Sequence, residues 1–138
     1  MSSDITIHSK CFACGHENAG GLNLQFESID EISVSCECIV PKSYQGYPGV
    51  VQGGIVATIL DSAMTNCLFV LGIEAMTVRL NVKFQSPVCT EVPLRVSARL
   101  LKAKKTVYDL EAFIEQDENI KATATAKFMS VKRKAQRG

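Results

Sequence analysis

Two adjacent glycines ahead of a long apolar segment are the first candidates for chemistry in this chain. Gly53 and Gly54 directly precede Ile55–Leu71, where most residues are apolar. The first backbone N–H groups of a helix have no intrahelical partner and lie at the positive end of its dipole. Because glycine allows close approach, a carbonyl placed there would be polarised and its developing oxyanion stabilised. The alternative is a glycine pair that only permits a sharp turn from loop to helix.

Asp61 is the only carboxylate in the apolar segment, and it lies too deep to cap the helix. A carboxylate on a largely buried helix needs a partner or a function. Seven residues of helix span roughly 10 Å, which is too far for Asp61 to reach a carbonyl held at its own Gly53 and Gly54. The two groups therefore suit one reaction only if they come from two subunits related by a two-fold axis. The alternative is an Asp61 that bonds within its helix or across a dimer and serves packing.

One long helix and a series of alternating strands must position these groups. The helix is predicted over Ile55–Leu71, with Gly72 as its C-terminal cap. Because it is apolar on most sides, it must be enclosed on most sides. Residues 41–54 are rich in glycine and proline and are expected to form a long functional loop. Period-two alternation predicts strands at residues 22–26, 32–38, 76–84, 94–100, 108–114 and 120–128.

These elements predict an α+β fold with the order β-β-α-β-β-β-β, in which a curved antiparallel sheet wraps one central helix. The three small residues Ala122, Ala124 and Ala126 leave room for something bulky on the face of the last strand. A chain of 138 residues fits one domain. Within it, residues 1–21 are expected to be irregular and residues 132–138 to form a solvated basic tail.

Composition narrows the function classes. The chain is 46% hydrophobic and 21% charged, which is typical of a globular protein, and a net charge of +1 gives no sequence-wide case for nucleic-acid binding. No apolar run approaches about 18 residues, so we expect no membrane span. Six cysteines without a visible secretion signal indicate reduced thiols and a cytoplasmic protein.

The cysteines also raise the alternative of a zinc site, through Cys11-x-x-Cys14, His16 and Cys36-x-Cys38. Cys36 and Cys38 alternate in phase with apolar Ile32, so they are expected in the core as free thiols. We therefore expect no metal.

Three segments resemble the hotdog-fold thioesterases of the PaaI-like acyl-CoA group: YQGYPGVVQGGIVATILDSAM, TVRLNVKFQSPV and LLKAKKTVYDLEA. A fourth, CFACGHENAGGLNLQF, resembles the N-terminal segment of many such chains, so the resemblance covers roughly residues 11–131. It implies a long helix wrapped by an antiparallel sheet, two subunits paired edge to edge, and two active sites at the dimer interface. A dimer of dimers is expected, with acyl-CoA as substrate and no cofactor.

The resemblance also implies roles for particular residues. Gly53 and Gly54 would bind the thioester carbonyl, and Asp61 would act as general base or nucleophile. Thr77, expected on the non-core face of its strand, would help to place the attacking water. The chain departs from the family at Gln52, where many relatives have His, and at Gly46, where some have Asn. Gln52 can exchange hydrogen bonds but does not titrate near neutrality, and Gln45 is a possible substitute for the missing Asn amide.

Coenzyme A contacts are implied for the turn between two late strands. The residues of that turn are Lys102, Lys104, Lys105 and Thr106, and the alternative is an ordinary solvated hairpin. Arg79 and Lys83 are expected on the same face as Thr77 and are further candidates.

The resulting hypothesis is hydrolysis of an acyl-CoA thioester to a free acid and CoA. The alternative is a non-catalytic module that binds acyl-CoA. A hydratase on the same frame would need a catalytic histidine, and the only two, His8 and His16, precede the first predicted strand.

Overall fold

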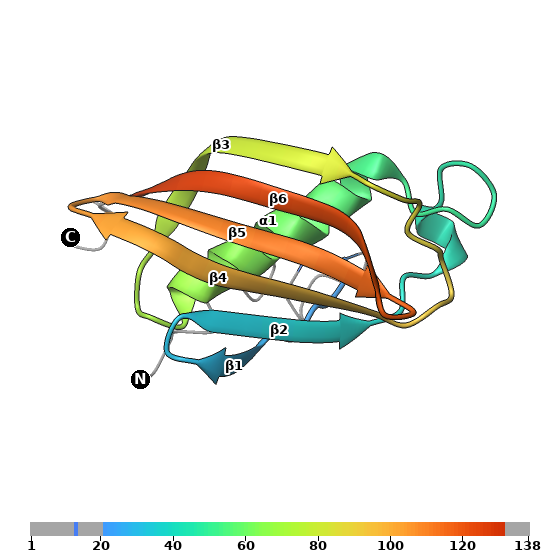
Figure 1. The fold of residues 1–138 in the computed structure, drawn as a ribbon, viewed down its shortest axis with the longest axis horizontal. Coiled ribbons are helices and arrows are strands. Elements are labelled where there is room, and N and C mark those ends of the chain that lie inside the picture. Colours follow the sequence, from blue (N-terminus) through green and yellow to red (C-terminus); the bar gives the residue numbers. More distant parts are fainter. Residues whose placement is uncertain (1–12, 14–20, 132–138) are drawn as a thin grey trace.

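A computed structural model describes residue 13 and residues 21–131. Six antiparallel strands form one sheet in the order β1-β2-β4-β5-β6-β3, and a single helix, α1 (Gly53–Phe69), crosses one face of that sheet diagonally (Figure 1). A short 3₁₀ helix, Lys42–Tyr44, precedes α1. The strands are β1 (Glu27–Asp30), β2 (Ser33–Cys38), β3 (Ala75–Phe84), β4 (Leu94–Lys104), β5 (Val107–Gln116) and β6 (Asn119–Ser130).

The core lies between α1 and the sheet, as the near-continuous apolar character of the helix predicts. Ile59, Leu60 and Met64 of the helix have no exposed surface, and neither has Phe128 of β6. The small alanines of β5 and β6 form part of the sheet face that α1 covers, so the helix is the bulky neighbour for which they leave room. The predicted α+β architecture and element order are confirmed.

The helix begins two residues earlier than predicted, at Gly53, and ends at Phe69. Gly72 closes it as expected: its φ of 82° is in the left-handed region, where glycine carries no steric penalty. Gly72 N–H donates to Phe69 O, and Ile73 N–H donates to Leu68 O, which satisfies carbonyls of the last turn. Within the described residues, no helix is long and apolar enough to cross a membrane.

The first predicted strand is wrong. Residues 22–26 form no strand, because Asn23 has a φ of 54°, in the left-handed region, and pairing begins instead at Glu27. Leu24 is buried in the core and its N–H donates to Ala13 O. The alternation of apolar residues there arises because they cover the core, not because they belong to a sheet.

A β-bulge in β3 overturns a second prediction. Thr77 pairs with Phe128 of β6, but Arg79 pairs with the very next residue, Lys127, so Val78 is an extra residue in the ladder. The extra residue reverses the alternation of side chains between the two faces. Thr77 therefore shares the core face with Phe128, whereas Met76 and Val78, predicted to be internal, are 63% and 53% exposed. Arg79 and Lys83, predicted on the face of Thr77, therefore lie on the opposite face.

Candidate active site

The glycine pair forms the first two residues of α1, and its backbone donors are free. Gln52 is the N-cap: its side-chain Oε1 accepts from Ile55 N–H at 3.1 Å, and its backbone O accepts from the N–H groups of Ile55 and Val56. Among the described residues, no acceptor is bonded to the N–H of Gly53 or of Gly54. Both glycines are exposed. Two donors at the positive end of a helix dipole are thus open to a ligand.

These donors lie beside a largely apolar cleft of about 670 Å³. Phe84, the last residue of β3, contributes to its wall, and a Cβ placed on Gly53 would lie 3.8 Å from the Phe84 ring. Phe84 is 56% exposed, although its pattern predicted a core position. The cleft is lined by Gly46, Tyr47, Val50, Val51, Gln52, Gly53, Val56, Phe84, Gln85, Ser86, Pro87 and Val88.

The loop before α1 is fixed by backbone hydrogen bonds to two other segments and by one within itself. Gln52 N–H donates to Tyr44 O at 3.0 Å, and Val51 N–H donates to Val88 O at 2.8 Å. Gly46 N–H donates to Val50 O, which closes the turn between them. The entry of the chain into the helix is therefore held from both sides, and the free glycine donors have a defined direction.

Asp61 and Thr77 form one hydrogen-bonded pair. The Thr77 Oγ1 hydroxyl donates to Asp61 Oδ1 at 2.6 Å, and both side chains are half-buried. The bulge at Val78 makes this contact possible, because it turns Thr77 toward the helix. Among the described residues, Asp61 Oδ2 has no partner. Thr77 was singled out in the sequence, but its orientation and its partner were not foreseen.

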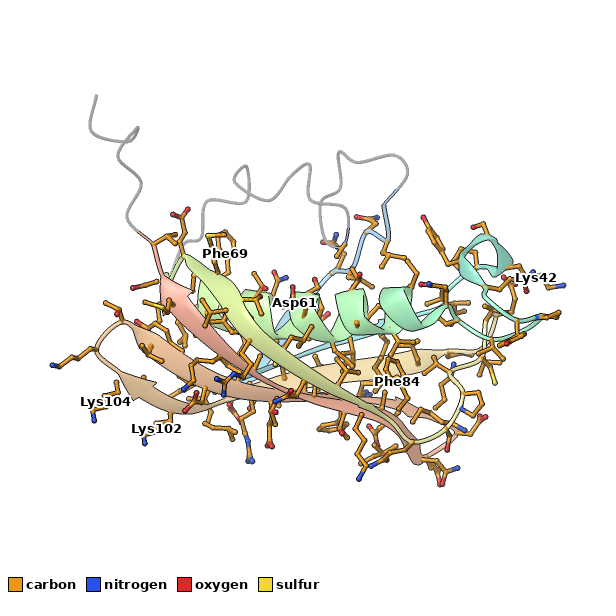
Figure 2. The ribbon with its side chains drawn as sticks, turned by 90° about the horizontal axis from the view of Figure 1, so that it is seen from above. Lys42, Asp61, Phe69, Phe84, Lys102 and Lys104 are labelled. Carbon is orange, nitrogen blue, oxygen red and sulfur yellow. The ribbon has the colours of Figure 1, made fainter. Side chains whose placement is uncertain are left out.

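The glycine donors and the Asp61–Thr77 pair are separate within one chain. Asp61 is not among the residues that line the cleft, and it lies in the middle of α1, whereas Phe84 marks the cleft end of β3 (Figure 2). Thr77 belongs to β3, which is an edge strand of the sheet. The carboxylate therefore lies beside a strand that has, among the described strands, a neighbour on one side only.

The lysines of the β4–β5 hairpin are far from the cleft beside the glycine donors. Figure 2 places Lys102 and Lys104 at the opposite end of the sheet from Phe84. They border a second cleft, of about 350 Å³, whose lining is Lys102, Lys104, Lys105, Thr106, Val107, Asp109 and Lys127. The hairpin turn itself is Lys105–Thr106, shorter than expected, and Lys105 has a φ of 58°.

Strand register explains how this basic cleft arises. One row of paired residues runs across four strands: Arg79 of β3, Lys127 of β6, Asp109 of β5 and Lys102 of β4. Lys127 Nζ bonds Asp109 Oδ1 at 3.1 Å, so one carboxylate lies among three cations in the row. The sequence does not indicate that Lys127 belongs to the basic cleft, because only the pairing of β5 with β6 brings it to that position. Lys83 lies apart, in a hollow over Phe113 and Thr123.

Gln45 does not stand in for an asparagine amide at the helix N-terminus. Its Oε1 accepts from Gly49 N–H at 3.0 Å, inside its own loop. Gly46 lies against the Gln52 backbone and side chain, since a Cβ there would meet Gln52 Cα at 3.5 Å. Gln52 itself is committed to capping through its oxygen, which leaves its Nε2 as the group that could meet a ligand.

The cysteines of β2 are core thiols, as expected. Cys36 is buried and Cys38 half-buried, and both are free. The Cys38 thiol donates to the Cys36 sulfur, which lowers the pKa of Cys36 and raises that of Cys38. Across the described part of the chain, no three His, Cys, Asp or Glu side chains gather as metal ligands. Cys11, Cys14, His8, His16 and the basic tail lie outside the described residues.

Comparison with known proteins gives consistent results. The family model described as the thioesterase superfamily matches residues 48–123, which include the glycine pair, Asp61 and Thr77. A curated relative, acyl-coenzyme A thioesterase THEM4 of Bos taurus, is 27% identical over 126 residues, covering 89% of this chain and 52% of the relative. The chain thus spans about half the length of that curated relative, and less of the rat protein of the same name.

Solved structures share the fold. A phenylacetic acid degradation-related protein of Ralstonia eutropha JMP134 is 27% identical, with a TM-score of 0.73 over 91% of this chain and 98% of that one. A hypothetical thioesterase of Streptococcus pneumoniae TIGR4, solved with coenzyme A, is 18% identical, with a TM-score of 0.75 over 81% and 88% of the two chains. The hotdog fold predicted from the sequence is confirmed.

Proposed function

Because this chain belongs to the thioesterase superfamily, we propose that it hydrolyses an acyl-CoA thioester to a free acid and CoA at sites shared between two subunits. One observation carries the proposal: the described residues leave two N–H donors unpaired beside an apolar cleft, and they leave one oxygen of a carboxylate unpaired beside an edge strand. These are an oxyanion site and a base, which hydrolysis of a thioester requires. The name of the bovine relative supports CoA thioesters as the substrates.

Helix geometry supports sharing between subunits. Gly54 and Asp61 are seven residues apart on one helix, roughly 10 Å of axial rise, so they cannot contact one carbonyl group. A two-fold axis beside β3 would bring the Asp61 of one subunit toward the glycines of the other, because symmetric pairing reverses the direction of the second helix. The exposed apolar residues Met76 and Val78 on the β3 edge strand favour such an interface.

In the proposed reaction, the thioester carbonyl oxygen accepts hydrogen bonds from the N–H groups of Gly53 and Gly54. Asp61 of the partner subunit removes a proton from water, and the water oxygen attacks the carbonyl carbon. The C–S bond then breaks, and the CoA thiolate takes the proton back from Asp61. Thr77 holds Asp61 Oδ1, so the other oxygen is oriented toward the water. No metal or redox group takes part.

The basic cleft is the proposed site for the phosphates of coenzyme A. Lys102, Lys104 and Lys105 come from the hairpin predicted for this role, and Lys127 and Arg79 extend the positive surface across the sheet. Flexible ammonium groups suit phosphate oxygens as point charges. Because the hairpin lies at the far end of its own sheet, the partner's cleft is the one that would serve a given glycine pair.

The test measures thiol release from a panel of aryl and short to long aliphatic acyl-CoA thioesters. The wild-type protein should hydrolyse at least one member, and Asp61→Asn should lose at least about a hundredfold in kcat while remaining folded. Glu111→Gln is the matched control, because it makes the same chemical change on the opposite face of the sheet. Loss of the folded dimer in Asp61→Asn would instead assign Asp61 to packing.

A single turnover in water enriched in oxygen-18 identifies the chemical role of Asp61. A general base leaves the new oxygen in the free acid at the first turnover. A nucleophilic Asp61 would displace the CoA thiolate and form an anhydride with the acyl group; water that opens this anhydride at the Asp61 carboxyl carbon would place the new oxygen first in Asp61.

A non-catalytic acyl-CoA-binding module is the second candidate. Gln52 favours it, because its amide caps α1 and supplies no titrating group beside the glycines. Binding of the acyl-CoA panel without turnover would select this function.

A further inference from the structure

Gln116 is a buried side chain that the proposed reaction does not use. It is the last residue of β5, and only 2% of its surface is exposed. Its Oε1 accepts from Cys89 N–H at 2.8 Å, and its Nε2 donates to Cys89 O at 2.9 Å and to Val92 O at 3.1 Å. Three hydrogen bonds thus tie one side chain to a segment more than twenty residues away. A buried amide that uses both of its donors and its acceptor oxygen is a specific anchor.

The anchored segment connects β3 to β4 and has no strand ladder of its own. Its backbone polar groups need other partners, since unpaired buried groups are costly. The Gln116 amide supplies them at Cys89 in the way that a neighbouring strand would. The same segment carries Gln85, Ser86, Pro87 and Val88, which form one wall of the glycine cleft.

A short series of hydrogen bonds leads from this segment to the helix N-terminus. Cys89 pairs with Val50 in an isolated β-bridge, and Thr90 N–H donates to Gly49 O at 3.0 Å. Val88 O accepts from Val51 N–H, and the next residue is the N-cap, Gln52. The Gln116 side chain therefore anchors the segment 88–90. That segment is hydrogen-bonded to residues 49–51, and residues 49–51 lead directly into the two free glycine donors.

We propose that Gln116 is a positioning residue that fixes the direction of the Gly53 and Gly54 N–H groups through the 88–90 and 49–51 segments. The inference rests on the proposed thioester hydrolysis. Those donors stabilise charge that develops only in the transition state, so misdirecting them lowers kcat more than it raises KM. Shifts of about 1 Å in such groups are sufficient for large losses of rate.

The kinetic test uses Gln116→Met, which keeps the length of the side chain and removes all three hydrogen bonds. We expect a loss of about tenfold or more in kcat, with KM for the acyl-CoA substrate within about twofold of wild type. Ile114→Val is the matched control: it lies two residues earlier on β5, is fully buried, and pairs with Val96 of β4 rather than hydrogen-bonding the 88–90 segment through its side chain. It should lose stability without losing kcat. Equal effects of the two variants on kcat would overturn the proposal.

A second readout does not depend on turnover. In nuclear magnetic resonance spectra of the ligand-free protein, the amide peaks of Gly53 and Gly54 should shift in Gln116→Met and stay in place in Ile114→Val. Unchanged peaks would overturn the positioning role even if the enzyme is active. Shifted peaks in a protein without thioesterase activity would instead reject only the proposed function. If Gln116→Met does not fold, Gln116→Glu keeps the acceptor for Cys89 N–H and loses two donors, and the same readouts apply.

Discussion

The Gly54→Ala variant distinguishes two hypotheses: that the glycine pair takes part in catalysis, and that it only permits a turn. A Cβ on Gly54 would lie 2.8 Å from Gln52 Oε1, a distance that real contacts of this kind do not reach. The Gln52 side chain would have to move, and its hydrogen bond to Ile55 N–H would be lost. The new methyl group would also stand beside the Gly54 N–H, where the thioester oxygen is expected.

Opposing effects leave the stability of this variant almost unchanged. Losing a side-chain N-cap costs about 1 kcal/mol, within a range of about 0.5–2 kcal/mol. Replacing glycine by alanine in a helix contributes up to about 1 kcal/mol in the other direction. The net change is close to zero, so the melting temperature should stay within about 5 °C of wild type.

Activity should fall far more than stability. Alanine keeps the backbone N–H, but a methyl group that keeps the thioester oxygen away from this donor should cost as much as its removal, about 10²–10³ in kcat or about 2.7–4 kcal/mol of transition-state stabilisation. The assay is thiol release from the best acyl-CoA substrate, with calorimetry on the same preparations. Gly53→Ala is the control for stability, because its Cβ meets only Phe84 at 3.8 Å. A Gly54→Ala protein with wild-type kcat would refute the oxyanion role, and a large fall in melting temperature would assign the glycine to the turn.

Two further predictions follow from the basic cleft and from a buried thiol. The double variant Lys102→Ala/Lys104→Ala should raise KM about three- to tenfold for an acyl-CoA but not for the matching acyl-pantetheine, which lacks the nucleotide phosphates. Arg95→Ala is the control. Equal effects of the double variant on the KM of both substrates would exclude phosphate contacts. Burial raises the pKa of the Cys67 thiol from 9.0 to about 11, so the folded state holds this proton more tightly than the unfolded state. The contribution of this thiol to stability is complete below pH 9 and is lost as the pH rises toward 11. Thermal melts should show the melting temperature falling over this range, and the fall should be smaller in Cys67→Ala. An identical fall in both proteins would contradict its assignment to Cys67.

The sequence predicts much of this fold because its patterns are local. The apolar character of Ile55–Leu71 and the alternation in the strands depend on residues close together in the chain, so the helix and five strands are found near their true positions. The segment at 22–26 also alternates, but its residues cover the core without pairing. Alternation reports which residues are buried, and a strand also needs a partner that no local pattern reveals.

The site is predicted in its residue types but not in its geometry. Gly53, Gly54 and Asp61 could be selected from spacing and resemblance. The Thr77 contact depends on one extra residue at Val78, and period-two reasoning cannot count across a bulge. Lys127 joins the basic cleft only through strand register, and Gln116 acts on a segment more than twenty residues away. Contacts set by long-range pairing are outside the reach of local patterns.

Mixing two inactive variants tests the shared site most directly. Asp61→Asn lacks the base, and Gly53→Leu fills the cleft against Phe84, so each homodimer should be inactive. After subunit exchange, half of the dimers are mixed, and each mixed dimer carries one intact site, which predicts about one quarter of wild-type activity. Mass spectrometry of the native dimers measures the exchange. Recovery near one quarter is the result we expect, and a mixture that stays inactive after exchange would contradict a site built from two subunits.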